Sequence, residues 1–330
     1  MSPSQNNFAT ITDTVNDYLS TIKLARSENT ARTYFNALQL FQSTLRNNNL
    51  PPQKTNIQGI NEDTISWFAA DLKHHSPATE RLYLSAVCGY FEYLTAENLA
   101  SVNLSRIRLL IRQRARKPGQ RLPQFPRKQI ESIMEYTKYL ANLPVKDETE
   151  HLRNLRDRAF LITLADTGLR VMEACSLRRG DIDWNEGKAI IIGKGNRQAV
   201  VRFSSRSNAA LRDYLKVRAR LDGASGKPLA TLPLFARHDK GAGKKILAIT
   251  TTTGRNIVAQ RVAEALGEEA VGSITPHSFR HYFVTAVLRG SGGNLKLAQE
   301  LARHRNIAVT QRYAHLSDDE LDRGYLDIFG

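Results

Sequence analysis

The sequence predicts a mainly α-helical protein of two domains, the second of which carries a small β-hairpin or sheet. A chain of 330 residues is too long for one ordinary core, which favours two domains. Hydrophobic residues make up 41% of the chain and charged residues 24%, the balance of a globular protein. Apolar residues recur at helical spacing in most segments, whereas KAIIIGKGNRQAVVRF is typical of a β-hairpin.

Residues 16–110 indicate an all-helical domain of four or five helices. Its helical stretches are TARTYFNALQLFQSTLRNN, NEDTISWFAADLKHH and SPATERLYLSAVCGYFEYLTAEN. Good capping residues precede each of them; the expected caps are Ser27 or Asn29, Asn61 or Asp63, and Ser76 before Pro77. The side chains expected in the core are Tyr34, Leu38, Phe41, Leu45, Ile65, Phe68, Leu72, Leu82, Val87, Tyr90, Phe91 and Leu94.

A basic stretch then interrupts the helical pattern. Residues 106–130 hold nine lysines and arginines and no acidic residue, and they include Pro118, Gly119, Pro123 and Pro126. Such a stretch by itself is a solvated linker as often as not, but in so basic a chain it favours a segment that lies against phosphates. We expect a helical domain at 1–112, a linker at 113–126 and a second domain at 127–330.

The second domain is predicted to be mostly helical with one strand pair. The apolar helix LRDRAFLITLADTG ends at Thr167-Gly168. The hairpin has strands at 190–192 and 199–203, joined by a turn at 193–196. The further helices are expected in NAALRDYLKVRARL, GRNIVAQRVAEALG, TPHSFRHYFVTAVLRG, NLKLAQELARH and VTQRYAHLS.

The charge balance indicates a polyanionic partner. Lysine and arginine outnumber aspartate and glutamate by 47 to 32, a net charge of +15, which favours nucleic acid first and an anionic membrane surface second. No apolar run approaches the ~20 residues of a membrane span, and the N-terminus lacks the pattern of a signal peptide. Cys88 and Cys175 form neither a disulfide framework nor a CxxC clip. These features predict a reduced, cytoplasmic protein.

Several polar residues stand where an apolar pattern would not place them. Arg170 begins a new helix after the break at 167–169, and Glu173 lies three residues on. Lys194 is at the hairpin tip between two glycines, and His277 and Arg280 share a helix face. Each has an ordinary explanation, as a turn residue or a solvated helix face. Their order and spacing together carry the functional signal.

In that order, the residues resemble the tyrosine recombinase (phage integrase) family. TGLRVMEACSL resembles its first arginine box, GKGNRQAVV its lysine hairpin and HSFRHYFVT its H-x-x-R box. GGNLKLAQELARHRNIAVTQRYAH resembles its final box, in which a histidine lies nine residues before a tyrosine. The resemblance spans most of the chain, because residues 10–110 also resemble the family's helical core-binding domain.

The resemblance implies a Xer-like two-domain recombinase, with a SAM-like core-binding domain and a mixed α/β catalytic domain. Such an enzyme cleaves and rejoins duplex DNA through a 3′-phosphotyrosyl intermediate, for mobile-element integration or excision or for chromosome-dimer resolution. No domain precedes residue 10, so an arm-binding module of the phage type is not expected. Neither a metal nor a nucleotide cofactor is expected.

The resemblance also implies the residues of the active site. The groups around the scissile phosphate would be Arg170, Lys194, His277, Arg280 and His304, with Tyr313 as the nucleophile. Arginine forks suit the non-bridging oxygens of a phosphodiester. Lys194 would protonate the leaving 5′-hydroxyl, and His277 would act as acid or base near the tyrosine. His281 is expected to support this site or to pack.

One position departs from the family. The residue before the final histidine is usually glycine, and here it is Arg303. A long cation beside His304 would touch DNA, crowd the site or point outward, and the sequence leaves these three possibilities open.

The C-terminal tail, SDDELDRGYLDIFG, has an amphipathic pattern. Ser317 can cap a helix whose apolar side holds Leu321, Tyr325, Leu326 and Phe329. So short a helix is not stable alone in water, so it must dock. It would dock on its own domain or, as the resemblance implies, on a neighbouring protomer, which would join four protomers on two DNA sites.

Three other functions compete with recombination. A type IB topoisomerase-like enzyme would use the same chemistry without pairing two sites. A non-catalytic DNA-binding protein would use the boxes to hold phosphate only. A metal-dependent hydrolase would use His277 and His281, but it lacks the neighbouring glutamate of an H-E-x-x-H site.

Overall fold

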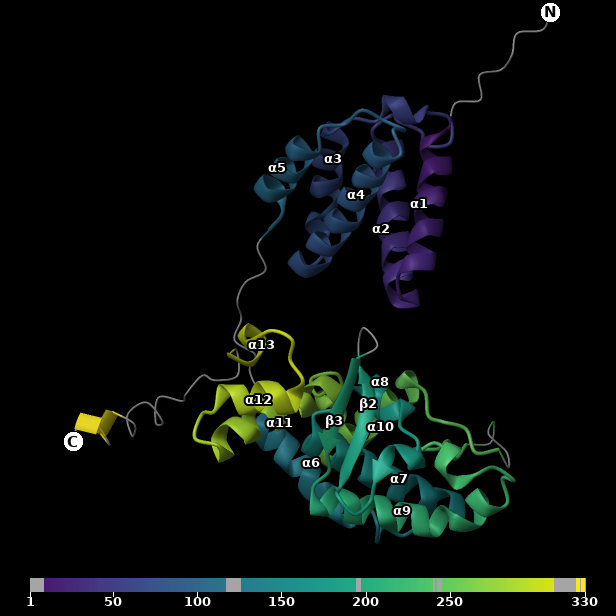
Figure 1. Ribbon diagram of the computed structural model, residues 1–330, viewed down its shortest axis with the longest axis vertical. Coiled ribbons are helices and arrows are strands. Elements are labelled where there is room, and N and C mark those ends of the chain that lie inside the picture. Colours follow the sequence, from purple (N-terminus) through teal and green to yellow (C-terminus); the bar gives the residue numbers. More distant parts are fainter. Residues whose placement is uncertain are drawn as a thin grey trace, which may run out of the picture. The chain divides into compact units, whose positions relative to one another are not determined.

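The computed structural model divides the chain into two compact units, Met1–Gln120 and Arg121–Gly330. It describes residues 9–116, 126–193, 197–239, 241, 245–311, 325–326 and 328–329. Helices dominate both units, and the sheet found among the described residues belongs to the C-terminal unit (Figure 1). The predicted fold class, mainly α with a small sheet, is confirmed.

The N-terminal unit is a bundle of α-helices. They are α1 (Ile11–Ala25), α2 (Glu28–Asn47), α3 (Asp63–Asp71), α4 (Pro77–Ala96) and α5 (Leu104–Arg114), with short 3₁₀ helices at Ile57–Gly59 and Leu72–His74. Eleven of the twelve predicted core residues pack in one apolar cluster, Tyr34 at its edge. Leu82 is the exception and is 48% exposed. Leu84, Val87, Phe91 and Leu94 form the inward stripe of α4, and Leu82 lies off that stripe because two residues turn a helix by about 200°.

The predicted N-caps are confirmed at two of the three helices. Ser27 accepts a hydrogen bond from the Thr30 amide, and Ser76 accepts one from the Thr79 amide just before Pro77. The third helix differs, since Glu62 occupies its N-cap position and makes no side-chain cap. Asn61 still accepts a hydrogen bond from the Asp63 amide at 3.0 Å. An Asn turn therefore precedes α3 in place of an Asn or Asp cap.

The first part of the basic stretch is helical and fixed to its own unit. Helix α5 continues to Arg114, and the Arg116 side chain then reaches Glu80 with Nε 2.6 Å from Oε2. Glu80 is fully buried and also binds Lys73 at 2.8 Å. Burial alone would raise the pKa of Glu80, but the hydrogen bonds from Lys73 and Arg116 lower it to about 2. The chain therefore leaves the helical unit from an anchored arginine, and residues 117–125 lie outside the described residues.

The C-terminal unit is built around α7 (Glu148–Thr167), a long central helix. Its other helices are α6 (Arg127–Tyr139), α8 (Val171–Ser176), α9 (Ser205–Gly223), α10 (Thr251–Leu266), α11 (Pro276–Gly290), α12 (Leu295–Ala302) and α13 (Ile307–Gln311). Helix α7 contacts α6, α8, α9 and α11. From Leu152 onward it is buried on nearly all sides, and its buried residues include the polar Asn154, Arg156 and Asp157, whose side chains must find partners inside the unit.

The sheet has three antiparallel strands in the order β1-β2-β3. They are β1 (Ile182–Asp183), β2 (Lys188–Gly193) and β3 (Arg197–Arg202), and Ile190 faces Val200 across the β2–β3 pair. The predicted hairpin is therefore confirmed, while its tip at 194–196 lies outside the described residues. The two-residue strand β1 was not predicted, because so short a strand has no periodicity to detect.

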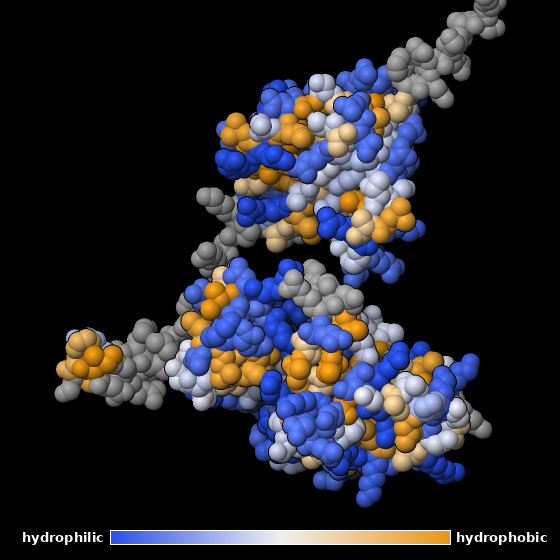
Figure 2. All heavy atoms as spheres, in the orientation of Figure 1, coloured by the Kyte–Doolittle hydropathy of each residue, from blue (hydrophilic) through white to orange (hydrophobic). Residues whose placement is uncertain are grey.

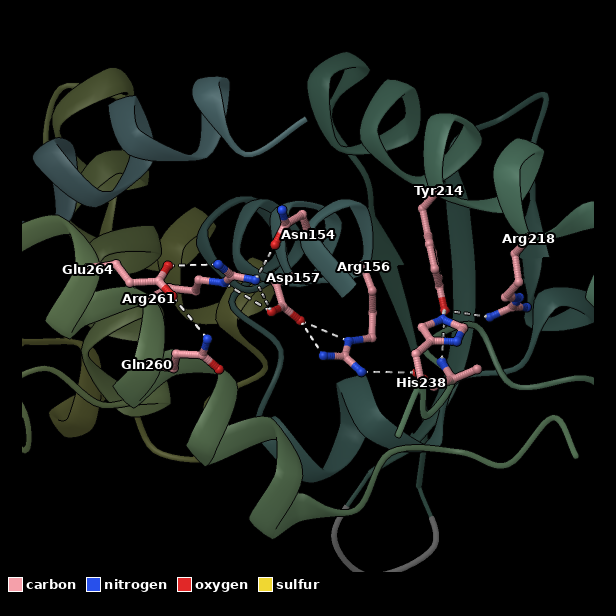
Figure 3. A network of polar contacts seen from close by, with 10 residues as sticks. Asn154, Arg156, Asp157, Tyr214, Arg218, His238, Gln260, Arg261 and Glu264 are labelled. Atoms are coloured by element: carbon pink, nitrogen blue, oxygen red, sulfur yellow. Dashed lines mark hydrogen bonds and ion pairs between the residues drawn. The ribbon is translucent and has the colours of Figure 1, made fainter. Parts of the chain in front are cut away.

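A buried polar network links the helices of this unit (Figure 3). The Asp157 carboxylate of α7 binds Arg156 at 2.7 Å and Arg261 of α10 at 2.7 Å. Nearby, the Tyr214 hydroxyl lies 2.7 Å from Nε2 of His238. Burial, followed by the charges of neighbouring arginines, lowers the pKa of His238 to about 3. The imidazole is therefore neutral in the folded protein.

Two surface features bear on function. No helix in the described part of the chain is long and apolar enough to cross a membrane. The described residues near the C-terminus form an apolar cluster, orange in Figure 2, in which Tyr325, Leu326 and Phe329 are each more than 60% exposed.

Candidate active site

The site begins where α7 ends. Gly168 adopts a left-handed conformation with φ of 58°, and a Cβ there would lie 2.4 Å from Cδ1 of Phe283. Glycine is therefore required both by the backbone and by the close approach of α11. The turn places Arg170 at the N-cap of α8. Its amide donates to Oε2 of Glu173 at 2.8 Å, and its Nη1 donates to Oε1 at 2.8 Å.

Helix α11 brings Arg280 against this turn. Pro276 occupies the first turn of the helix, where its missing N–H has no intrahelical partner to lose. Arg280 is only 2% exposed, and its guanidinium donates to the carbonyls of Gly168 and Ala302. Each of these two nitrogens keeps a second hydrogen. Arg280 thus joins the end of α7 to the end of α12.

His304 follows the end of α12. Its Nδ1 lies 2.9 Å from the Thr310 hydroxyl of α13, an interaction that fixes the orientation of the ring. Burial, followed by the charges of Arg280, Arg170 and Arg303, lowers the pKa of His304 to about 4. Its imidazole is therefore neutral near pH 7.

The two histidines of α11 stand one turn apart. The ring centroids of His277 and His281 are 4.3 Å apart at an interplanar angle of 68°. Burial and then the charges of Arg280 and Arg170 lower the pKa of His277, and burial with the charge of His277 lowers that of His281 to about 4. The described residues contain no group of three or more His, Cys, Asp or Glu side chains placed to hold a metal ion.

Arg303 points into the site. It adopts φ of 58° at the end of α12, and its side chain is 11% exposed. Its Nη2 lies 3.2 Å from the Gly168 carbonyl oxygen and 3.4 Å from Oε2 of Glu173. Of the three possibilities left by the sequence, an outward orientation is therefore wrong.

An open cleft of about 920 Å³ is lined by Arg170, Arg303 and His304 among the residues above, and also by the carboxylates of Glu173 and Glu300. Its cationic and imidazole lining comes from α8, β3 and the α12–α13 connection, and consists of Arg170, Arg202, Arg303, His304 and Arg305. Arg202 and Arg305 were not singled out from the sequence. Arg202 occupies the end of a strand and Arg305 a loop, and a single arginine at either place carries no pattern.

The structure brings four of the six predicted site residues into one neighbourhood. Arg280 touches the Gly168 carbonyl beside Arg170, and the charges of both arginines act on His277 and His304. Lys194 and Tyr313 lie outside the described residues. Gly193, next to Lys194, lines the cleft, and α13 ends at Gln311, two residues before Tyr313.

The two units also match family models. Residues 124–320 match the phage integrase family, and residues 15–98 match the phage integrase N-terminal SAM-like domain. The chain therefore belongs to the phage integrase family and is a tyrosine recombinase, an enzyme that cleaves and rejoins DNA.

Two curated relatives and two solved structures are similar to this chain over most of its length. The chain is 29% identical to tyrosine recombinase XerC of Treponema denticola, covering 90% of this chain and 91% of that one. It is 28% identical to XerC of Thermodesulfovibrio yellowstonii, covering 92% and 91%. A structure of XerH recombinase bound to its difH substrate after cleavage shares the fold, with a TM-score of 0.68, 18% identity and coverage of 96% and 83%. The Tn1549 transposon integrase bound to DNA does so with a TM-score of 0.65, 18% identity and coverage of 98% and 100%.

Proposed function

We propose that this recombinase cleaves DNA by attack of the Tyr313 hydroxyl on a backbone phosphate. The attack would form a 3′-phosphotyrosyl link and release a 5′-hydroxyl, and a partner strand's 5′-hydroxyl would then reverse the reaction. The energy of the broken bond stays in the covalent link, so rejoining needs no nucleotide.

Arg170 and Arg280 would hold the non-bridging oxygens of that phosphate. Charge develops on these oxygens during transfer, and fixed guanidiniums stabilise it most in a partly desolvated site. Arg280 is suited to a fixed position because two backbone carbonyls hold it. Arg170 is suited to contact from the cleft, since its side chain is 45% exposed.

The remaining groups would move protons and place the phosphate. His277, whose pKa is lowered, would accept the tyrosine proton as a neutral base. Lys194 would protonate the leaving 5′-oxygen. His304, held by Thr310, would donate a hydrogen bond from Nε2 to the phosphate. Both Lys194 and Tyr313 are assigned by resemblance to the family motif.

One observation carries the proposal. Arg170, Arg280 and His304 come from three separate segments of sequence and meet around the Gly168 turn, beside a cleft with a cationic lining. The Glu173 carboxylate, which binds both Arg170 and Arg303, offsets only one of the positive charges of Arg170, Arg280 and Arg303, so this neighbourhood can still attract an anion. A phosphodiester is such an anion.

We also propose a tetramer that works on two duplex sites in the cytoplasm. The chain would consist of three parts: a DNA-binding domain at 1–112, a basic linker at 113–126 and a catalytic domain at 127–330. The exposed apolar side chains Tyr325, Leu326 and Phe329 support exchange of the C-terminal segment between protomers. The biological role of the recombinase would be mobile-element integration or excision, or chromosome-dimer resolution. A relaxing enzyme of the type IB topoisomerase kind would not need this assembly.

The test is capture of a covalent protein–DNA adduct on nicked candidate sites, read on denaturing gels. Tyr313→Phe removes only the hydroxyl, so we expect normal DNA binding and no adduct. Tyr139→Phe, an exposed tyrosine of α6, serves as the matched control and should form adduct as the unmodified protein does. An adduct of ordinary yield from Tyr313→Phe would disprove the assignment of the nucleophile.

A further inference from the structure

Arg303 occupies a backbone position that suits glycine. Its φ of 58° and ψ of 42° are left-handed, a region in which side chains with a Cβ are disfavoured. Glycine would fit there without strain, and glycine is what the family motif usually carries at this position. The contacts of the arginine side chain must therefore offset the backbone strain, or the side chain must have a functional role.

The side chain reaches the first arginine box across at least 130 residues of sequence. Nη1 lies 3.4 Å from the Thr167 carbonyl oxygen, and Nη2 lies 3.2 Å from that of Gly168 and 3.4 Å from Oε2 of Glu173. Nε is buried and has no hydrogen-bond partner among the described residues. These contacts are long or incomplete, and burial lowers the pKa of Arg303. Packing alone does not account for a desolvated cation here.

Glu173 explains the need for a second cation. Glu173 is 5% exposed, and its carboxylate binds Arg170 through both oxygens. Burial would raise the pKa of Glu173, but the hydrogen bonds from Arg170 and the charge of Arg303 hold it below its usual value. An ionised Glu173 competes with a phosphate for the Arg170 guanidinium, because both are anions that fit the same fork.

We propose that Arg303 is a positioning residue for Arg170: it neutralises Glu173 and fixes the Gly168 turn, so that the Arg170 fork can turn to the scissile phosphate. The inference rests on the proposed role of Arg170. When the phosphate binds, Glu173 keeps the Arg170 amide and the Arg303 guanidinium as partners. Arg280 holds the same Gly168 carbonyl, so the turn is fixed from α11 and from α12.

The test compares the single-turnover cleavage rates of single and double variants, with a nicked duplex that traps the covalent adduct. Arg303→Gln removes the charge and keeps donors of similar reach, and we expect it to slow cleavage about tenfold. Arg303→Lys keeps the charge without the fork and should be intermediate. In Glu173→Gln/Arg303→Gln the unneutralised carboxylate is gone, so cleavage should be faster than in Arg303→Gln alone.

Two controls separate the alternatives. Arg303→Gly relieves the left-handed strain, so slow cleavage by this variant, with an unchanged thermal midpoint, excludes misfolding as the cause. If Arg303 itself contacted a phosphate, the slope of log affinity against log salt would fall by about 0.9 in Arg303→Gln. We expect the slope to be unchanged.

Three results would overturn the inference: cleavage by Arg303→Gln at the unmodified rate, a double variant no faster than Arg303→Gln, or a reduced salt slope in Arg303→Gln. The last result would show that Arg303 contacts a phosphate directly. Failure of the unmodified protein to form any adduct would instead contradict the proposed function, so the two failures are distinguishable.

Discussion

Arg170 and Glu173 are joined twice, once through the backbone amide of Arg170 and once through its guanidinium, each at 2.8 Å. The first bond caps helix α8 and does not depend on the side chain of Arg170. The second holds a guanidinium that is still 45% exposed to the cleft. The backbone at Arg170 is therefore fixed independently of the side chain that we propose to bind phosphate.

This separation gives a prediction for Arg170→Lys. The helix cap remains and the charge is kept, so folding and DNA affinity should change little. The bidentate fork is removed, and the cleavage rate should fall by at least about 100-fold, the usual effect of removing one such donor. Binding by gel shift and adduct formation should be measured on the same nicked DNA. Near-normal cleavage with weakened binding would make Arg170 a docking residue only.

The buried His238 predicts an acid-sensitive C-terminal unit. Its pKa is about 3 in the folded state and about 6.5 in an unfolded chain. Between about pH 3 and pH 6.5, His238 is protonated in the unfolded state but not in the folded state. Its contribution to the free energy of unfolding is therefore fully present above about pH 6.5 and is lost as the pH falls towards 3. The loss from this group is on the order of 4 kcal/mol.

The measurement is urea unfolding at pH 7 and pH 4.5, monitored by the fluorescence of Trp184 in a Trp67→Phe variant. Since the chain has two tryptophans, this signal reports the C-terminal unit alone. His238→Gln keeps a polar partner for Tyr214 and should narrow the difference in unfolding free energy between the two pH values. His151→Gln is the matched control. An equal pH dependence in both variants would exclude His238 as the source.

The arginines of α5 differ in whether a carboxylate already binds them, and this difference allows a matched test of the basic stretch. Arg108 binds Glu92 at 2.5 Å, whereas Arg112 and Arg114 are exposed. If the stretch lies along DNA, Arg112→Gln/Arg114→Gln should reduce the slope of log affinity against log salt by about 0.9 for each phosphate no longer neutralised, without changing site preference. Arg108→Gln should leave the slope nearly unchanged. Identical slopes in all three proteins would show that the stretch does not contact DNA.

The C-terminal segment predicts an assembly defect. Deletion of residues 318–330 removes the exposed side chains of Tyr325, Leu326 and Phe329. We expect unchanged binding to one site, loss of the cooperative complex on a two-site DNA, and altered cleavage. A gel-shift ladder of full-length and shortened protein makes the comparison. If both form the higher-order complex equally, the segment docks on its own domain.

Local signals in the sequence were sufficient for most of the elements, although α5 and α6, at the two ends of the basic stretch, were not predicted. Caps such as Ser27 and Ser76, and apolar spacing such as Leu38, Phe41 and Leu45, depend on neighbours within a few residues, and both were predicted. Leu82 was misplaced because an apolar residue beside an inward stripe differs from a member of it only by its angle around the helix. Strand β1 was missed because two residues have no period.

The site was only partly determined by sequence. The order of Arg170, Lys194, His277, Arg280, His304 and Tyr313 was sufficient to identify the family, since each box is a local pattern at a fixed spacing. What joins the boxes could not be predicted: the Gly168 carbonyl receives both Arg280 and Arg303, and Glu173 serves two arginines. Nothing within a few residues of Arg303 indicates that its side chain turns inward. Its direction depends on a carbonyl and a carboxylate more than 100 residues away, and only the folded chain brings these groups within hydrogen-bonding distance.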